Sequence, residues 1–141
     1  MREILQEIKQ VIDNVDVTII SYVDEEGYPI SKAMLKPRKV EDLKVFWFST
    51  NTSSNKVKSF RNNSKASIYF FDKSTFKGVS IKGNVEVIDT KSVKESIWQD
   101  GDLLYYSKGV EDPDYCVLKF IVDKYRYYSN FKSIDINVKD M

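Results

Sequence analysis

The chain of 141 residues carries 22 basic and 21 acidic side chains, giving a formal net charge of +1, and 42% of its residues are hydrophobic. This length and composition predict a single soluble globular domain over residues 1–141. The balanced charge offers no general attraction for nucleic acid or for a membrane surface, and no apolar run approaches the roughly 20 residues that span a membrane. We therefore expect neither nucleic acid nor a membrane as a partner.

The residue types needed for several common kinds of catalysis are absent from this sequence. It contains no histidine, and Cys116 is its only cysteine. These absences exclude Ser-His-Asp and Cys-His catalysis and the usual zinc sites, so we expect no metal site. Any chemistry must come from carboxylates, lysines, tyrosines or a bound cofactor. A single cysteine, expected to be buried, and an N-terminus without the apolar core of a signal peptide favour a cytoplasmic protein.

The N-terminal part of the chain predicts one helix and then antiparallel strands. Apolar side chains recur at helical spacing over residues 2–14, which is typical of a helix with one buried face. Short runs rich in β-branched and aromatic residues predict strands at 16–23, 28–35 and 43–50, with a turn between the first two at Gly27.

The C-terminal part continues the series of strands and adds short helices. The elements expected there, in chain order, are a helix at 54–63, strands at 65–72 and 76–89, a helix at 90–98, a helical turn at 102–106, and a closing antiparallel pair at 115–122 and 124–131. Because most strand pairs lack a helix between them, the sequence predicts a mainly β fold. We expect an antiparallel barrel with helices at its ends rather than a parallel α/β fold.

Two charged segments are expected to be solvated connections. The segment 36–42 places Lys36, Arg38 and Lys39 within one turn, and charges on such a turn are usually hydrated. The loop 107–114 collects three carboxylates without the ordered spacing of a calcium-binding loop. Neither segment is therefore expected to contribute to a binding site.

Seven consecutive small hydroxyl or amide residues, 49–55, precede a helix whose first turn contains Lys56. A helix N-terminus has unpaired N–H groups and a partial positive charge, so a lysine there is unfavourable unless an anion lies close by. The hydroxyls of Thr50, Ser53 and Ser54 could donate hydrogen bonds to a phosphate, and the ammonium could neutralise it. The alternative is a polar helix cap beside a mobile loop.

The same segments have a distinctive order along the chain. A basic residue on a strand precedes a strand that ends in a hydroxyl-rich triplet, then a Ser-x-Lys helix start, then paired asparagines before the next strand. The corresponding residues are Lys32-Ala33-Met34, Ser49-Thr50-Asn51, Ser54-Asn55-Lys56 and Asn62-Asn63-Ser64. Over roughly residues 10–130 this pattern resembles the FMN-binding split-barrel family related to pyridoxamine 5′-phosphate oxidase, and looks closest to its general-stress-protein-like branch.

This resemblance implies a six-stranded antiparallel Greek-key split β-barrel that forms a homodimer, with FMN bound in two clefts at the interface. It implies that Lys32 and Lys56 pair with the phosphate. Thr50 and Ser54 would donate hydroxyl hydrogen bonds to it, and Asn55 stands where relatives often carry a second basic residue. The other residues implied to bind the cofactor are Ala33, Met34 and Leu35, which would line the isoalloxazine, Ser49, and Trp98 and Tyr128, which would approach the ring from the partner subunit or instead pack in the core.

Two departures from the family pattern bear on activity. Gly78 stands where the oxidases place a flavin-contacting glutamine, and the C-terminal segment lacks the histidine of the segment that holds pyridoxal phosphate in true oxidases. The resemblance therefore implies an FMN-dependent oxidoreductase acting on an unidentified small molecule, without true pyridoxamine phosphate oxidase activity. Because FMN itself would carry the hydride or electrons, no catalytic residue is identified.

Three alternatives remain open at this point. The chain could be a non-enzymatic flavin-binding, storage or sensing protein, or a deazaflavin or haem could occupy the same cleft. An antiparallel barrel with exposed aromatic residues could also bind single-stranded nucleic acid by stacking, although the balanced charge argues against this function.

Overall fold

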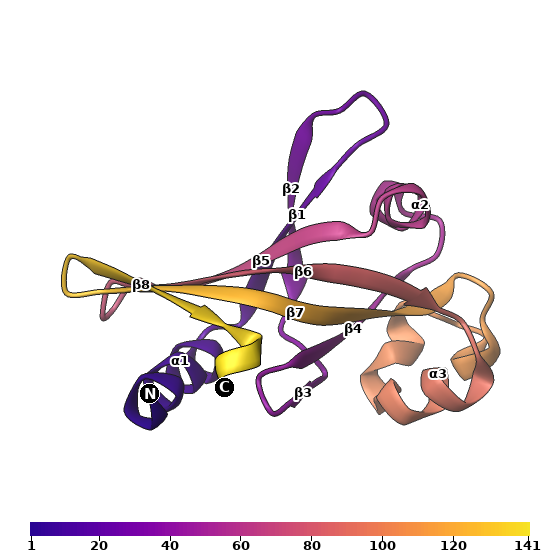
Figure 1. The fold of residues 1–141 in the computed structure, drawn as a ribbon. Helices are drawn as coiled ribbons and strands as arrows, with labels where there is room; N and C mark the ends of the chain where they lie inside the picture. Colours follow the sequence, from indigo (N-terminus) through magenta and orange to yellow (C-terminus); the bar gives the residue numbers. More distant parts are fainter.

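Eight antiparallel strands form the body of the computed structural model, which describes all residues from Met1 to Met141 (Figure 1). Neighbouring strands follow the order β2-β1-β5-β6-β7-β4-β3, and β8 pairs with β7 off this path. The strands are β1 (Val17–Val23), β2 (Pro29–Leu35), β3 (Lys39–Glu41), β4 (Val45–Asn51), β5 (Lys65–Asp72), β6 (Lys77–Ile88), β7 (Tyr115–Ser129) and β8 (Lys132–Asn137).

The sheet curls on itself without closing. All neighbouring strands are antiparallel, but the two ends of the path, β2 and β3, do not pair with each other. Residues of β2 and β4 line a common hollow, so the opening lies between these two strands. This arrangement confirms the predicted mainly β, antiparallel split-barrel fold, with eight strands where the sequence pattern predicted seven and the resemblance implied six.

Two of these strands lie in segments where no strand was expected. β3 has only three residues and comes from the charged segment 36–42, where only Val40 is apolar. β8 has a single buried residue, Ile136. Neither segment has the alternating apolar pattern of a half-buried strand, because each pairs at the rim of the sheet.

The closing antiparallel pair expected within 115–131 is wrong, because these residues up to Ser129 form the single strand β7. A bulge at Asp123, opposite a register shift in β6, interrupts the alternation of buried side chains, which resumes at Tyr125. The chain reverses only at Asn130 and Phe131, whose φ angles are 51° and 63°. In the sequence pattern, the bulge inside this one strand therefore looked like a turn between two strands.

Three α-helices and three short 3-10 helices cover the sheet. α1 packs on β5 and β6, α2 packs on β1 and β6, and α3 packs on β4 and β7. The predicted helices and the helical turn are confirmed, and no helix combines the length and apolar character that crossing a membrane requires. The helices are α1 (Arg2–Asn14), α2 (Asn55–Asn62), α3 (Lys91–Ile97), η1 (Asp100–Leu104), η2 (Gly109–Glu111) and η3 (Val138–Asp140).

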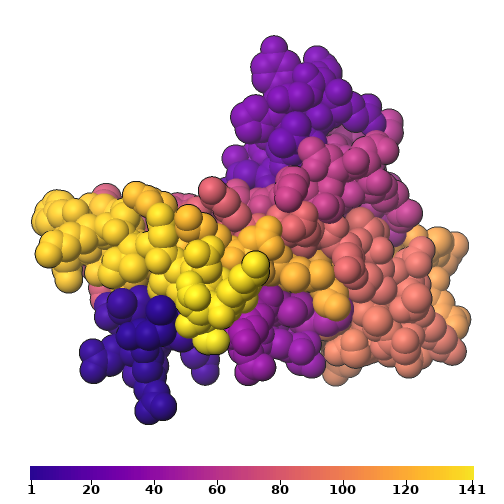
Figure 2. All heavy atoms as spheres, viewed as in Figure 1, coloured from indigo at the N-terminus to yellow at the C-terminus, as the bar shows by residue number.

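Two hydrophobic clusters hold these layers together. The larger fills the barrel between the sheet, α1 and α2, and includes Cys116, which is buried as expected. The smaller lies under α3, where Ile97, Tyr106, Tyr115 and Val117 pack together. The β1–β2 hairpin stands out from the body, with α2 beside it (Figures 1 and 2). The hairpin and α2 therefore flank the open side of the barrel.

Gly83 permits the close approach of β6 and β7 at the bulge, and a side chain there is expected to destabilise the fold. An added Cβ would overlap the carbonyl oxygen of Ile121 and lie 2.7 Å from the ring of Phe120. We expect Gly83→Ala to lower the free energy of unfolding by about 1–3 kcal/mol, measured by urea denaturation. Gly101→Ala is the matched control, because its Cβ would meet nothing within 4 Å. Equal stability of the two variants would contradict this account.

Candidate functional site

The opening between β2 and β4 contains a hollow of about 180 Å³, called here the split cleft. Its walls come from the two strands, from the first turn of α2 and from the segment that follows α3. Six residues predicted to bind a cofactor meet there from three separate parts of the sequence. The lining consists of the predicted residues Ala33, Met34, Leu35, Ser49, Thr50 and Lys56, together with Arg38, Asn51, Asp102, Tyr105 and Tyr106, which were not predicted.

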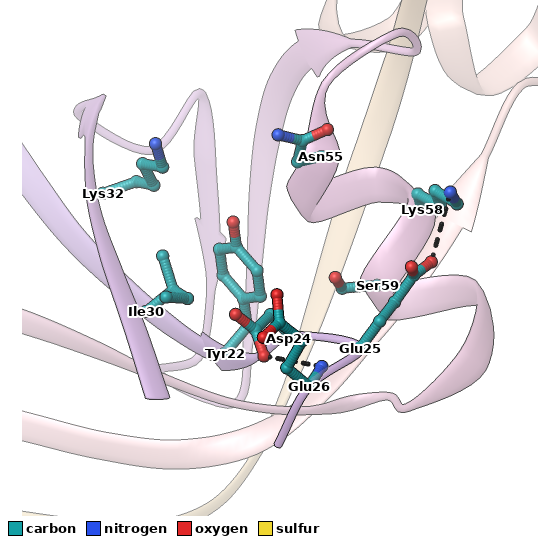
Figure 3. Close-up of a pocket in the computed structure, with 9 residues that line it drawn as sticks. All are labelled: Tyr22, Asp24, Glu25, Glu26, Ile30, Lys32, Asn55, Lys58 and Ser59. Atoms are coloured by element: carbon teal, nitrogen blue, oxygen red, sulfur yellow. Dashed lines mark hydrogen bonds and ion pairs between the residues drawn. The ribbon is translucent and has the colours of Figure 1, made fainter. Parts of the chain in front are cut away.

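A second hollow of about 380 Å³, called here the hairpin pocket, lies between the β1–β2 hairpin and α2 (Figure 3). Two more of the predicted residues, Lys32 and Asn55, face this pocket rather than the split cleft. The remaining lining residues are Tyr22, Asp24, Glu25, Glu26, Ile30, Lys58 and Ser59.

The two hollows lie on either side of one seam between β2 and α2. On β2, Lys32 lines the hairpin pocket and its neighbour Ala33 lines the split cleft. On α2, Asn55 lines the pocket and its neighbour Lys56 lines the cleft. The residues predicted to bind one phosphate are therefore brought together at this seam, although they face two hollows.

Lys56 dominates the electrostatics of the seam. Its side chain is half-buried, its ammonium lies 3.5 Å from the Oγ of Ser54, and neither Lys56 nor Lys32 forms an ion pair with a carboxylate. Burial lowers the pKa of the Lys56 ammonium below its ordinary value, and the positive charge of Lys32 lowers it further. Nearby Cys116 gives no negative charge at neutral pH, because burial raises the pKa of its thiol. A bound anion would supply the missing charge.

The loop before α2 is held by Asp114, which was expected to be a solvated carboxylate. One carboxylate oxygen of Asp114 accepts a hydrogen bond from the Ser53 amide at 2.8 Å, and its backbone carbonyl accepts one from the Thr52 amide at 2.7 Å. The other carboxylate oxygen accepts a bond from the Asn51 side chain at 3.3 Å. Ser54 is the N-cap residue of α2, but its hydroxyl makes no capping hydrogen bond. This hydroxyl is therefore not committed to the helix.

The expectation that Arg38 is solvated is wrong, because its guanidinium is buried against Asp102. Both guanidinium nitrogens donate to the carboxylate, at 2.6 and 2.9 Å, and the two side chains are only 11% and 4% exposed. Asp102 also accepts a hydrogen bond from the Gln99 amide at 2.9 Å. This ion pair fixes η1 against the barrel, and Tyr105 follows η1 directly at the split cleft.

Tyr106 also holds this wall of the split cleft in place. Its hydroxyl donates a hydrogen bond to the side-chain oxygen of Asn51 at 3.1 Å, and burial raises the pKa of the phenol well above its ordinary value. The phenol therefore stays protonated at neutral pH and acts as a hydrogen-bond donor rather than as a base.

Trp98 and Tyr128 do not line the split cleft of their own chain. Trp98 is half-buried in the smaller hydrophobic cluster, where its ring packs edge-on against Tyr115 at a centroid distance of 5.2 Å. Tyr128 lies on the outer face of β7 beside Phe76, with ring centroids 6.3 Å apart. A contact of either residue with a cofactor bound to a second subunit stays a prediction.

Sequence reasoning missed Arg38, Asp102 and Tyr22, each for lack of a local signal. The ion-pair partners lie 64 positions apart, and a charged turn looks the same whether it is hydrated or buried. The alternation of apolar and polar residues in β1 indicates that Tyr22 is buried. It does not indicate which pocket the hydroxyl of Tyr22 faces. No group of three or more cysteine, aspartate or glutamate side chains could hold a metal ion. The site combines the ammonium groups of Lys32 and Lys56 with the partly apolar lining of the split cleft.

Comparison with known proteins assigns this architecture to a family. The family profile described as "Pyridoxamine 5'-phosphate oxidase like" matches residues 3–139. The chain belongs to this family. The predicted resemblance is thereby confirmed. No curated protein matches the chain significantly.

Solved structures of the same architecture extend the comparison. A Clostridium acetobutylicum protein related to general stress protein 26 of Bacillus subtilis is 34% identical, with 99% of this chain and 98% of that chain covered and a TM-score of 0.91. General stress protein 26 from Bacillus anthracis is 20% identical, with 94% and 98% covered and a TM-score of 0.76. A heme binding protein from Mycobacterium smegmatis is 13% identical, with 95% and 57% covered and a TM-score of 0.75. The last two similarities concern the fold alone.

Removal of Arg38 is expected to release the wall of the split cleft. Arg38→Ala leaves the carboxylate of Asp102 buried without its partner, so we expect the free energy of unfolding to fall by about 3–5 kcal/mol in chemical denaturation. Lys91→Ala is the control, because its ion pair with Glu111 is 70% and 76% exposed and should contribute almost nothing. Similar stabilities of the two variants would show that the buried pair does not hold η1.

Proposed function

We propose that this protein binds FMN and uses it as an oxidoreductase acting on a small molecule. The observation that carries this proposal is the pair of lysines at the seam. Lys32 and the half-buried Lys56 lie close enough for one to lower the pKa of the other, and neither has a carboxylate partner. Two ammonium groups near a helix N-terminus, with no carboxylate within ion-pair distance of either, would favour a phosphate between them.

The residues around the seam fit the remaining parts of FMN. The hydroxyls of Thr50 and Ser54 would donate hydrogen bonds to the phosphate, and Asn55 would add a neutral amide. The flavin ring would lie in the split cleft along Met34 and the neighbouring backbone of β2. When bound, FMN would supply the redox chemistry, while the chain would bind, orient and shield it from water.

An exposed aromatic row on the outer face of the sheet supports a homodimer. The ring of Phe71 stacks on Tyr69, with centroids 6.4 Å apart, and meets Phe76 edge-on at 5.0 Å. These three residues are 39%, 38% and 63% exposed, which is unusual for a connected group of large rings. Ala33 is paired with Ile19, and Ile19 with Tyr69, so this face continues to the split cleft.

The small volume of the split cleft also favours a homodimer. Its volume of about 180 Å³ falls below the roughly 300–1,000 Å³ of ordinary small-molecule sites. A partner subunit covering the aromatic row would add a further wall to the cleft. We therefore include in the proposal a homodimer with flavin at the interface, where Tyr128 or Trp98 of the partner subunit would approach the ring.

A second candidate is a non-enzymatic flavin-binding or sensing protein, because no catalytic residue is identified at the cleft. The phenol of Tyr106 stays protonated at neutral pH, since burial raises its pKa. Haem in the same cleft would correspond to the heme binding for which the Mycobacterium smegmatis protein is named. This chain has no histidine to ligate the iron.

The visible spectrum of the protein purified without added cofactor tests the proposal. We expect flavin absorption bands and the release of FMN on denaturation, identified by mass. A Soret band would indicate haem instead, and a colourless protein that does not bind FMN in a titration would overturn the proposal. Turnover of a reduced nicotinamide with a quinone or nitro acceptor would distinguish an oxidoreductase from a storage protein.

Removal of either lysine is expected to weaken binding through the phosphate alone. We expect Lys56→Ala and Lys32→Ala each to weaken FMN binding by about 1.5–3 kcal/mol, the range for a hydrogen bond to a charged group. Riboflavin, which has no phosphate, should bind the variants and the wild type equally. Fluorescence titrations with both flavins measure the difference. Unchanged FMN affinity in both variants would reject the phosphate assignment.

The depressed pKa of Lys56 predicts that FMN affinity declines at alkaline pH. In the free protein the Lys56 ammonium loses its proton at a pH below its ordinary pKa of 10.5. Above this lowered pKa, Lys56 must take up a proton when the phosphate binds. Affinity should then fall by up to about tenfold per pH unit. In Lys56→Arg the guanidinium keeps its charge, so the decline should be absent over the same pH range. A parallel decline in wild type and variant would mean that another group is responsible.

A further inference from the structure

A buried lysine lies beside the smaller hydrophobic cluster, outside both hollows. Lys94 of α3 is only 7% exposed, and it lines neither the split cleft nor the hairpin pocket. Its ammonium lies 5.2 Å from the centre of the Tyr115 ring, and it forms no ion pair with a carboxylate. Because an ammonium loses hydration on burial, the contacts that Lys94 makes inside the protein must compensate for that loss.

These contacts fasten α3 to the turn that leads into β7. The Lys94 ammonium donates a hydrogen bond to the backbone carbonyl of Asp112 at 3.1 Å. In the opposite direction, the hydroxyl of Tyr115 donates a hydrogen bond to the backbone carbonyl of Lys94 at 2.8 Å. The attraction between the ammonium and the face of the Tyr115 ring adds to both. The turn 112–115 is therefore held at its two ends by one residue of α3.

The same turn contains Asp114, which holds the loop before α2. A carboxylate oxygen of Asp112 accepts a hydrogen bond from the Asp114 amide at 3.0 Å, so the position of Asp114 depends on that of Asp112. Asp114 in turn accepts the hydrogen bonds from the amides of Thr52 and Ser53 described above. A continuous series of contacts therefore runs from Lys94 through this turn to the loop at the seam.

From this series we propose that Lys94 is a positioning residue for the phosphate site. It holds the turn 112–115, and through that turn Asp114 keeps the loop before α2 in the arrangement that receives a phosphate. Lys94 itself touches no ligand. Without its ammonium the loop adopts several arrangements, and the affinity for a phosphate falls with the fraction that is competent to bind. This inference rests on the proposed function, because the phosphate at the seam is that of FMN.

Fluorescence titrations of the full-length protein with FMN and riboflavin test this inference. Lys94→Met keeps an unbranched apolar chain and removes the ammonium. We expect FMN affinity to fall about 3–10-fold, while riboflavin, which has no phosphate, changes less than about twofold. Lys91→Met is the matched control, because Lys91 lies on the same helix in an ion pair whose members are 70% and 76% exposed. It should change neither affinity.

A double-mutant cycle tests whether Lys94 acts through Asp114. Asp114→Ala removes the carboxylate that binds the loop and should weaken FMN binding at least as much as Lys94→Met. If both substitutions act on the same series of contacts, the loss in the double variant should be smaller than the product of the two single losses. Losses that multiply fully would overturn the proposed route.

The remaining outcomes separate the inference from the proposed function. Unchanged FMN affinity in Lys94→Met, or equal weakening of FMN and riboflavin, would overturn the inference. If Lys94→Met does not fold, Tyr115→Phe removes the other hydrogen bond to α3 and keeps the ring, and it should lower FMN affinity alone by about twofold or more. No selective loss of FMN there would also overturn the inference. If neither flavin binds the wild-type protein, the proposed function fails and the inference fails with it.

Discussion

β2 has a hydrogen-bonding partner on one edge only, and the candidate site depends on this fact. The strand pairs with β1, ends the path of the sheet and leaves its other edge facing the opening toward β4. An unpaired edge normally invites another chain to pair with it. Here the edge lines a cleft that also contains a half-buried lysine without a carboxylate partner, and in the proposed function an anionic ligand rather than another strand would occupy the opening.

Most of the fold could be predicted because burial follows local periodicity in most elements. Residues 2–14 and 65–72 alternate between buried and exposed positions with the period of a helix and of a strand, and both were predicted with their observed bounds. The failures lie where periodicity breaks or is absent. The bulge at Asp123 interrupts the alternation within β7, and β3 and β8 lie at the rim of the sheet, where too few side chains are buried to form a pattern.

The candidate site could be predicted only as far as sequence neighbours determine it. The segments around Lys32 and Lys56 stood out by residue type, and the structure brings them to one seam. The supports of the site come from far along the chain: Arg38 binds a carboxylate 64 positions away, and Ser53 binds one 61 positions away. Pairings of this kind depend on how the sheet curls, and no local pattern of charge distinguishes them from hydrated side chains.

The hydrogen bonds from the loop before α2 to Asp114 have a consequence for the thermodynamics of ligand capture. Because Asp114 already fixes the backbone around Ser53, a ligand arriving at the seam would find the amides and hydroxyls of the loop nearly in their final positions. Binding would then order little additional chain, so little conformational entropy would oppose it. Such a site is preorganised. Selectivity among phosphate-bearing ligands would therefore depend on how well each ligand fits the existing shape rather than on how readily the loop adapts.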